Sequence, residues 1–215
     1  LALFKAGEVE RCTLLLENAK LLERVQQASQ QQWDQIDIEK EERHQQDLAA
    51  LRLLADIYQL ILATDKAEIL FDQLLRLDSN LSLQRAAAAF YHGNNCKVKA
   101  LNLLPNIVAN PELEKEEKAR LYEQMGDSYT SLGQLEPALE AYLAHQKANS
   151  EILEAFPDRF LVKEQLAVAQ EKIGMTYFAM GNLESALTSF EERLRLGQAL
   201  LKTNPRENRY KQGVM

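Results

Sequence analysis

Glycine and proline are scarce in this chain, and the signals of β-strands are almost absent. Only 8 glycines and 5 prolines occur among 215 residues. No run alternates valine, isoleucine or threonine with polar residues, and no Asn-Gly or Asp-Gly hairpin turn occurs. Alanine, leucine, glutamate, glutamine, lysine and arginine dominate, and these residues lose least on entering a helix. The absences exclude a β-rich fold and predict an all-α protein.

Basic charge, long apolar runs and paired cysteines are lacking as well. The net charge is −7, so the basic excess that phosphate binding requires is missing and we expect no nucleic-acid partner. No stretch approaches about 18 uninterrupted apolar residues, so we expect no membrane partner. Cys12 and Cys96 lie far apart and give no disulfide framework. Without a signal-peptide pattern, these features favour a cytoplasmic location.

Two segments of the sequence repeat each other at an offset of 48 residues. The matched positions are Gly126 and Gly174, Tyr129 and Tyr177, Gly133 and Gly181, Leu135 and Leu183, Ala138 and Ala186, Leu139 and Leu187, and Tyr142 and Phe190. In mid-helix, glycine costs about 1 kcal/mol relative to alanine, so we expect close helix packing at Gly126 and Gly174. Gly133 and Gly181 fall where a first helix should end in a glycine cap.

This spacing resembles the tetratricopeptide repeat, a hairpin of two helices with a glycine, a tyrosine, a turn glycine, an alanine and an aromatic residue at these positions. Weaker copies lie upstream, at Tyr58, Ala67 and Phe71, at Tyr91, Ala100 and Leu104, and, for half a unit, at Gly7, Val9, Cys12 and Leu16. Ala55 and Ala88 stand at the mid-helix glycine position, and Leu62 replaces a turn glycine. The resemblance implies an all-α, right-handed α-α superhelix of about four to five hairpins.

The expected units are longer than the family's common length of about 34 residues. A single solenoid over 1–215 would consist of a partial unit 1–35, units 36–79, 80–110, 112–157 and 158–204, and the start of another at 205–215. Such long helices resemble the arrays of kinesin light chain and of large bacterial signalling proteins, and we expect the chain to be part of a longer protein. Pro105 falls inside an expected helix, which it should kink or end.

No catalytic, metal or cofactor motif accompanies the repeats. His92 and Cys96 are four residues apart, but Gly93, Asn94 and Asn95 break the helix between them and no second pair completes a zinc site. No phosphate-binding glycine loop or nucleophile motif occurs. We therefore expect no enzyme, no metal and no cofactor. The single tryptophan, Trp33, is expected in the helical core.

The resemblance implies that the first helices of the hairpins line a concave surface that binds a partner. Side chains at fixed offsets from the mid-helix glycine would face that partner. They are Arg52, Asp56, Gln59, Arg85, His92, Glu123, Asp127, Thr130, Glu171, Met175 and Phe178. The surface changes from basic to acidic along the chain, which suits an extended peptide of opposite polarity. The alternative is that these charges only solvate and support their helices.

The expected function is a protein-interaction scaffold for a protein or peptide partner. The resemblance suggests the regulatory or sensor arm of a larger bacterial signalling protein as its role. Two alternatives stay open: a small-peptide receptor that closes around a short ligand, and self-association, in which exposed repeat ends form a homodimer. The lysine, asparagine and arginine set with which chaperone-binding members hold a carboxylate is missing at the matching positions, so we expect no such clamp.

Overall fold

The computed structural model describes residues 21, 23, 38–78 and 80–203, and every regular element within these ranges is a helix. The prediction of an all-α fold is therefore confirmed. The predictions for Gly7, Val9, Cys12, Leu16 and Trp33, for the partial unit 1–35 and for the segment 205–215 lie outside the described residues.

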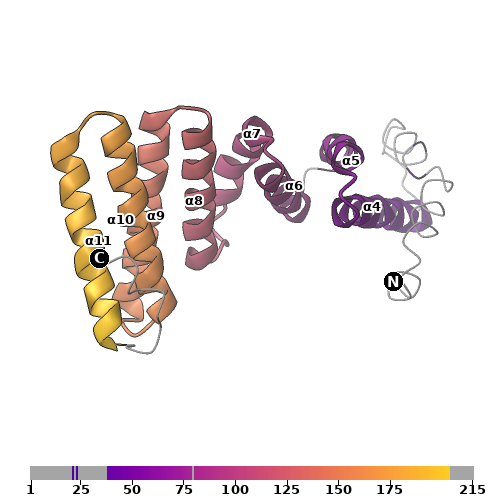
Figure 1. The fold of residues 1–215 in the computed structure, drawn as a ribbon. Coiled ribbons are helices and arrows are strands. Elements are labelled where there is room, and N and C mark those ends of the chain that lie inside the picture. Colours follow the sequence, from indigo (N-terminus) through magenta and orange to yellow (C-terminus); the bar gives the residue numbers. More distant parts are fainter. Residues whose placement is uncertain (1–20, 22, 24–37, 79, 204–215) are drawn as a thin grey trace. The chain divides into compact units, whose positions relative to one another are not determined.

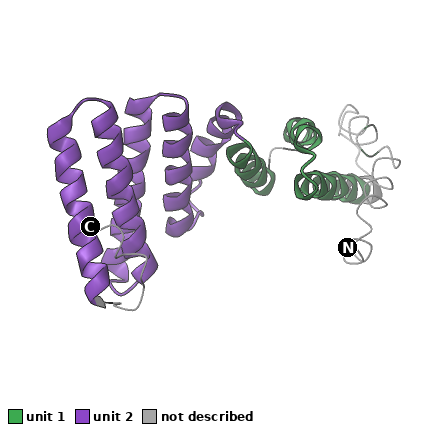
Figure 2. Ribbon diagram, viewed as in Figure 1, with its two compact units in different colours: residues 1–94 green, residues 95–215 purple. Residues whose placement is uncertain are grey.

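Eight helices are described, joined by short loops (Figure 1). In chain order they are α4 (Ile38–Leu60), α5 (Thr64–Leu77), α6 (Leu81–Gly93), α7 (Lys97–Val108), α8 (Lys115–Ser131), α9 (Leu135–Ala155), α10 (Phe160–Ala179) and α11 (Leu183–Thr203). The chain divides into two compact units, residues 1–94 and 95–215 (Figure 2). The first unit contains α4 to α6 and the second α7 to α11. The segment 80–110, which the sequence predicts as one hairpin, contributes one helix to each.

The core of the first unit is built around three aromatic rings. The ring centroid of Phe71 in α5 lies 4.9 Å from that of Phe90 and 6.3 Å from that of Tyr91, both in α6. All three side chains are buried, and the Tyr91 hydroxyl donates a hydrogen bond of 2.6 Å to Asp72 of α5. Because the hydroxyl finds an acceptor, the ring can leave water without the penalty of an unsatisfied polar group.

Pro105 lies inside α7 and not at its end. The helix continues for three residues beyond the proline and stops at Val108, which makes α7 the shortest of the described helices. The proline nitrogen has no proton to donate to the preceding turn. The loss of that bond falls in the last turns of the helix, where few later bonds depend on it.

In the second unit, α8 and α9 form one hairpin, and α10 and α11 repeat it 48 residues later. The first helices end at Ser131 and Ala179, and the second helices begin at Leu135 and Leu183. The second helices also end 48 residues apart, at 155 and 203. The sequence offset is thus an offset between whole elements.

An aromatic ring of the second helix lies directly on the backbone of the first helix in both hairpins. A Cβ atom added at Gly126 would lie 2.3 Å from the Tyr142 ring, and one added at Gly174 would lie 2.7 Å from the Phe190 ring. Both glycines are buried. No larger residue fits at these positions unless the helices move apart.

The first helix of three hairpins ends with the same backbone hydrogen bonds. Gly133, Gly181 and Leu62 have φ angles of 71°, 81° and 59°, in the left-handed region. The residue that follows each of them donates its N–H to the carbonyl of the signature tyrosine five residues earlier, at 2.9 Å in all three cases. Those tyrosines are Tyr129, Tyr177 and Tyr58. Leu62 therefore has the backbone conformation of a turn glycine although it carries a side chain.

A buried histidine joins the two hairpins of the second unit. His145 of α9 is 1% exposed, and its Nδ1 donates to the carbonyl of Ala119 in α8 at 2.7 Å. With the proton on Nδ1, Nε2 accepts from the Asn149 side chain at 3.2 Å. The same ring edge lies 3.3 Å from the carbonyl of Gln165 in α10. One imidazole thus contacts the backbones of both neighbouring helices.

Replacement of Gly126 by alanine should destabilise the protein by about 1–2 kcal/mol. The clash with a buried ring costs about 1–3 kcal/mol, which exceeds the gain of about 1 kcal/mol that alanine brings to a helix. Gly197→Ala is the matched control, because Gly197 is also helical and a Cβ there meets nothing within 4 Å. Urea denaturation followed by circular dichroism measures both. A Gly126→Ala variant as stable as Gly197→Ala would contradict the packing.

Leu62→Gly should stabilise the protein, by about 0.5–1 kcal/mol. The left-handed conformation costs a residue with a side chain about 1–2 kcal/mol, and the Leu62 side chain is 85% exposed, so little packing is lost with it. Leu60→Gly removes another exposed leucine, but from a helical position, and should destabilise by a similar amount. Equal effects of the two substitutions in thermal denaturation would show that the turn is not strained.

Candidate partner-binding surface

In the first unit, the predicted binding residues of α4 are already engaged within the fold. The Arg52 Nε atom lies 3.2 Å from Asp56 Oδ1, one turn away, and the Arg52 guanidinium lies 5.3 Å above the centroid of the Phe71 ring. Both charged side chains are half-buried, whereas Gln59 is exposed. On α6, Arg85 is exposed and His92 is half-buried.

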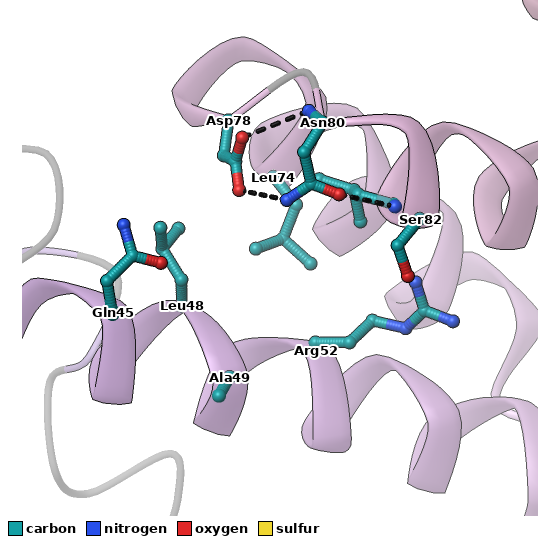
Figure 3. Close-up of a pocket in the computed structure, with 9 residues that line it drawn as sticks. Gln45, Leu48, Ala49, Arg52, Leu74, Asp78, Asn80 and Ser82 are labelled. Atoms are coloured by element: carbon teal, nitrogen blue, oxygen red, sulfur yellow. Dashed lines mark hydrogen bonds between the residues drawn. The ribbon is translucent and has the colours of Figure 1, made fainter. Parts of the chain in front are cut away.

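A small cavity lies beside Arg52, between α4, the end of α5 and the start of α6 (Figure 3). Its volume is about 200 Å³. Its lining residues are Gln45, Leu48, Ala49, Arg52, Leu74, Asp78, Asn80, Ser82 and Leu83. Asn80 caps α6 by accepting the Leu83 N–H at 2.9 Å, and Asp78 accepts the Asn80 N–H at 3.0 Å. The repeat offsets named only Arg52 of this set, because the cavity is formed largely by the loop between two hairpins.

In the second unit, Asp127 joins three helices. Its Oδ1 accepts a hydrogen bond of 2.7 Å from the Tyr142 hydroxyl of α9 and one of 2.7 Å from Lys172 Nζ of α10. The Thr130 hydroxyl lies 3.2 Å from the same Tyr142 hydroxyl. The Lys172 ammonium also lies 5.9 Å from the centroid of the Tyr142 ring. Sequence offsets placed Asp127 and Thr130 toward a partner, but both also contact the packed interior.

Glu171 is paired as well, whereas no ion pair is recorded for Glu123. Arg193 of α11 donates through Nε to Glu171 Oε2 at 2.8 Å, and both side chains are partly exposed. Such partly exposed pairs contribute about 1 kcal/mol or less. Glu123 is half-buried on α8. For Asp127 and Glu171, the geometry therefore agrees with the alternative that these charges support their helices, and they keep partial access to solvent.

Large apolar side chains are exposed on the last hairpin. Met175 and Phe178, both predicted binding residues on α10, are 58% and 64% exposed. On α11, Leu183 and Leu187 are 63% and 60% exposed. The sequence analysis assigned the two leucines only to the repeat pattern. It missed their exposure because their counterparts Leu135 and Leu139 carry the same letters and are half-buried.

The remaining signature positions differ in burial. Tyr58, Ala67, Phe71, Tyr91, Ala100, Gly126, Ala138, Tyr142, Gly174 and Ala186 are buried, Tyr129, Tyr177 and Phe190 are half-buried, and Gly133 and Gly181 are exposed. Among the described residues, no group of histidine, cysteine, aspartate and glutamate could hold a metal ion. None of the helices described in 38–78 and 80–203 has the length and apolar character that crossing a bilayer requires.

The helices of the second unit pack in chain order, α7 with α8, α8 with α9, α9 with α10 and α10 with α11. Stacked hairpins in which each contacts its sequence neighbour define an α-helical repeat protein. The tetratricopeptide repeat family model matches residues 119–150 and 167–196. These segments lie in the hairpins α8–α9 and α10–α11.

Solved structures are similar over most of the chain. Kinesin-light-chain TPR-like repeats from Podosopora anserina share 21% identity at a TM-score of 0.60, over 96% of this chain and 93% of that one. MamA MSR-1 shares 18% identity at a TM-score of 0.56, over 92% of each chain. MamA AMB-1 shares 19% at 0.55, over 92% and 95%. No curated protein matches the sequence.

The two matched segments are therefore tetratricopeptide repeats, and the fold of the chain is the all-α repeat fold of the tetratricopeptide superfamily. This confirms the resemblance that the glycine and aromatic spacing suggested.

Stability should fall above about pH 10 in a way that depends on Tyr142. Burial raises the pKa of Tyr142 well above its ordinary value, helped by the Asp127 and Glu123 carboxylates and opposed by the Thr130 hydrogen bond. The unfolded chain releases this proton near pH 10 and the folded chain retains it, so the folded state binds more protons and the free energy of unfolding falls as the pH rises further. Urea denaturation between about pH 8 and 11 should give a shallower fall for Tyr142→Phe. Parallel curves would contradict this assignment.

Proposed function

We propose that the chain is a protein-interaction scaffold that binds a protein or peptide partner on the exposed faces of its first helices. The observation that carries this proposal is the exposure of Met175 and Phe178 on α10, where Ile173, Gly174 and Thr176 are buried. Two large apolar side chains close together in water lower solubility and stability, and such patches are typical of interaction sites. A partner that covered them would gain apolar burial at about 25 cal/mol per Å².

The charges around these residues support a partner with basic flanks. Glu123, Asp127 and Glu171 are half-buried, so each keeps part of its carboxylate in contact with solvent. Pairing with Lys172 and Arg193 weakens the field of two of them. Electrostatics would therefore help orientation and association rate, and apolar contact would supply most of the affinity. In the first unit the corresponding charges are Arg52 and Arg85, which favour acidic partner residues there.

The finer role follows the same reasoning. A net charge of −7 favours a protein partner over a nucleic acid or an anionic membrane, and suits a cytoplasmic protein. The absence of metal-ligating clusters among the described residues fits a non-catalytic module. Long second helices such as α9 and α11, of 21 residues each, support a role as the regulatory arm of a larger bacterial signalling protein.

Self-association is the second candidate function, and a specific observation favours it. Leu183 and Leu187 expose apolar surface on the last described helix, beside Met175 and Phe178. The small-peptide receptor has less support. The cavity beside Arg52 is smaller than the range of about 300–1,000 Å³ that ligand pockets usually occupy.

Charge reversal at Glu123 and Glu171 tests the scaffold proposal. The probes are peptides of about 16 residues selected from a random display library for binding to the full chain. Joint Glu123→Lys and Glu171→Lys substitution should weaken their binding by roughly ten-fold at low salt, and the loss should shrink as salt screens the charges. The matched control reverses Glu184 and Glu191, two exposed glutamates on α11. If no peptide can be selected, or if both double variants bind equally well, the proposed surface is wrong.

A further inference from the structure

The 48-residue repetition makes it possible to compare a covered hairpin with an uncovered one. On the hairpin α8–α9, the next helix, α10, covers a face that includes Tyr142 and Leu139. Tyr142 is 2% exposed and Leu139 is half-buried. Both pack in a cluster with Ile173 of α10, and Lys172 of α10 donates to Asp127 in the same place. This face is therefore built to accept a helix.

The counterpart face on the hairpin α10–α11 is open within the described residues. We call it the α10–α11 apolar face, and it consists of Met175, Phe178, Leu183, Leu187 and Phe190. Leu187 is 60% exposed although its counterpart Leu139 is half-buried, and Phe190 is half-buried although its counterpart Tyr142 is fully buried. The backbone below is the same, because the Phe190 ring lies on Gly174 as the Tyr142 ring lies on Gly126.

The chemistry of the two faces differs at three positions together. Asp127, Thr130 and Tyr142 are replaced 48 residues later by Met175, Phe178 and Phe190. Every side-chain oxygen that gathers near Lys172 on the first hairpin is thus missing on the second. A lysine placed there would lose its carboxylate and its hydroxyl neighbours, and burial of an unpaired charge is costly. The face therefore selects an apolar side chain at the position that Lys172 occupies in α10.

We propose that the α10–α11 apolar face binds an amphipathic helix of a partner protein, which lies on it as α10 lies on α8–α9 and presents an apolar residue where α10 presents Lys172. The inference rests on the proposed scaffold function, since it names the class of partner for part of that surface. Continuity with the α9–α10 interface sets the shape of the occupant, and the three replacements set its polarity.

The length of the interface indicates the size of that helix. α10 has 20 residues, which corresponds to about 30 Å of helix. Residues 204–215 of this chain align at the same offset with 156–167 and stop short of the position of Lys172. That segment does not supply the residue that would face Met175 and Phe178. A helix of about five turns from a partner protein covers the whole face.

Two synthetic peptides test the proposal on the full chain. One has the sequence of α10, Phe160–Ala179, and the other carries Lys172→Leu within it. By fluorescence anisotropy, the Lys172→Leu peptide should bind at least about ten-fold more tightly. A triple variant of the protein, Met175→Asp, Phe178→Thr and Phe190→Tyr, restores the chemistry of the first hairpin. It should reverse the preference, so that the peptide with lysine binds more tightly.

Controls separate this inference from simpler outcomes. Ile69→Asp and Val98→Asp remove apolar side chains of similar exposure on α5 and α7 and should leave peptide binding unchanged. Circular dichroism of the triple variant verifies that it folds, and Phe190→Tyr alone, the mildest change, should reduce the preference if the triple variant does not fold.

Three results would overturn the proposal: equal affinity for both peptides, no binding by either at about 1 mM, or a preference that the substitutions do not change. Dimerisation in sedimentation equilibrium that the triple variant abolishes would also overturn it, because the face would then belong to a second copy. Library-selected peptides that still bind while both helical probes fail would leave the scaffold function standing and remove only this inference.

Discussion

The contact between an aromatic ring and bare glycine backbone determines most of the second unit. At Gly126 and Gly174 the absence of a Cβ lets the Tyr142 and Phe190 rings lie on the facing helix. That close approach sets the distance between the two helices of each hairpin and brings positions 127 and 130 beside the ring of residue 142. The first unit uses a weaker version, with buried alanines at 55 and 88. A methyl group in place of a hydrogen keeps the helices further apart, and the interior of that unit is filled instead by the stacked rings of α5 and α6.

How much could be predicted from the sequence depends on whether a feature is local. The turn glycines and the mid-helix glycines state their own requirements, since only glycine is free of strain at a positive φ and only glycine leaves space for a ring. The helical class and the superfamily follow from them. Side-chain partners could not be predicted. Asp127 meets Lys172 from 45 positions away, and Glu171 meets Arg193 from 22 away. No repeat offset shows whether a lysine or an arginine will reach a given carboxylate, because the rotamers and the stacking of the hairpins decide it.

Exposure could not be predicted either, and the leucines show why. Leu139 and Leu187 occupy the same position in two copies of one motif, and the sequence around them is similar. One is half-buried and the other 60% exposed because α10 follows the first hairpin and no described helix covers the second. In a repeat protein, each unit completes the core of the one before it. A motif therefore specifies a hairpin but not the neighbour that turns its outer face into an interior, and the same residue type can serve packing in one unit and recognition in the next.

The His145 ring has a consequence for mechanics. Apolar faces alone would tolerate some sliding of one hairpin along another, because leucine and alanine contacts are non-directional. A hydrogen bond from an imidazole to one particular carbonyl of α8, with α10 against the opposite edge of the ring, does not tolerate such sliding. The ring acts as a pin that fixes the register between successive repeats. At the corresponding position 48 residues later stands Arg193, which binds within its own hairpin. The array is thus locked on one side of the last hairpin and free to choose its register on the other, as a rigid platform with one adjustable end.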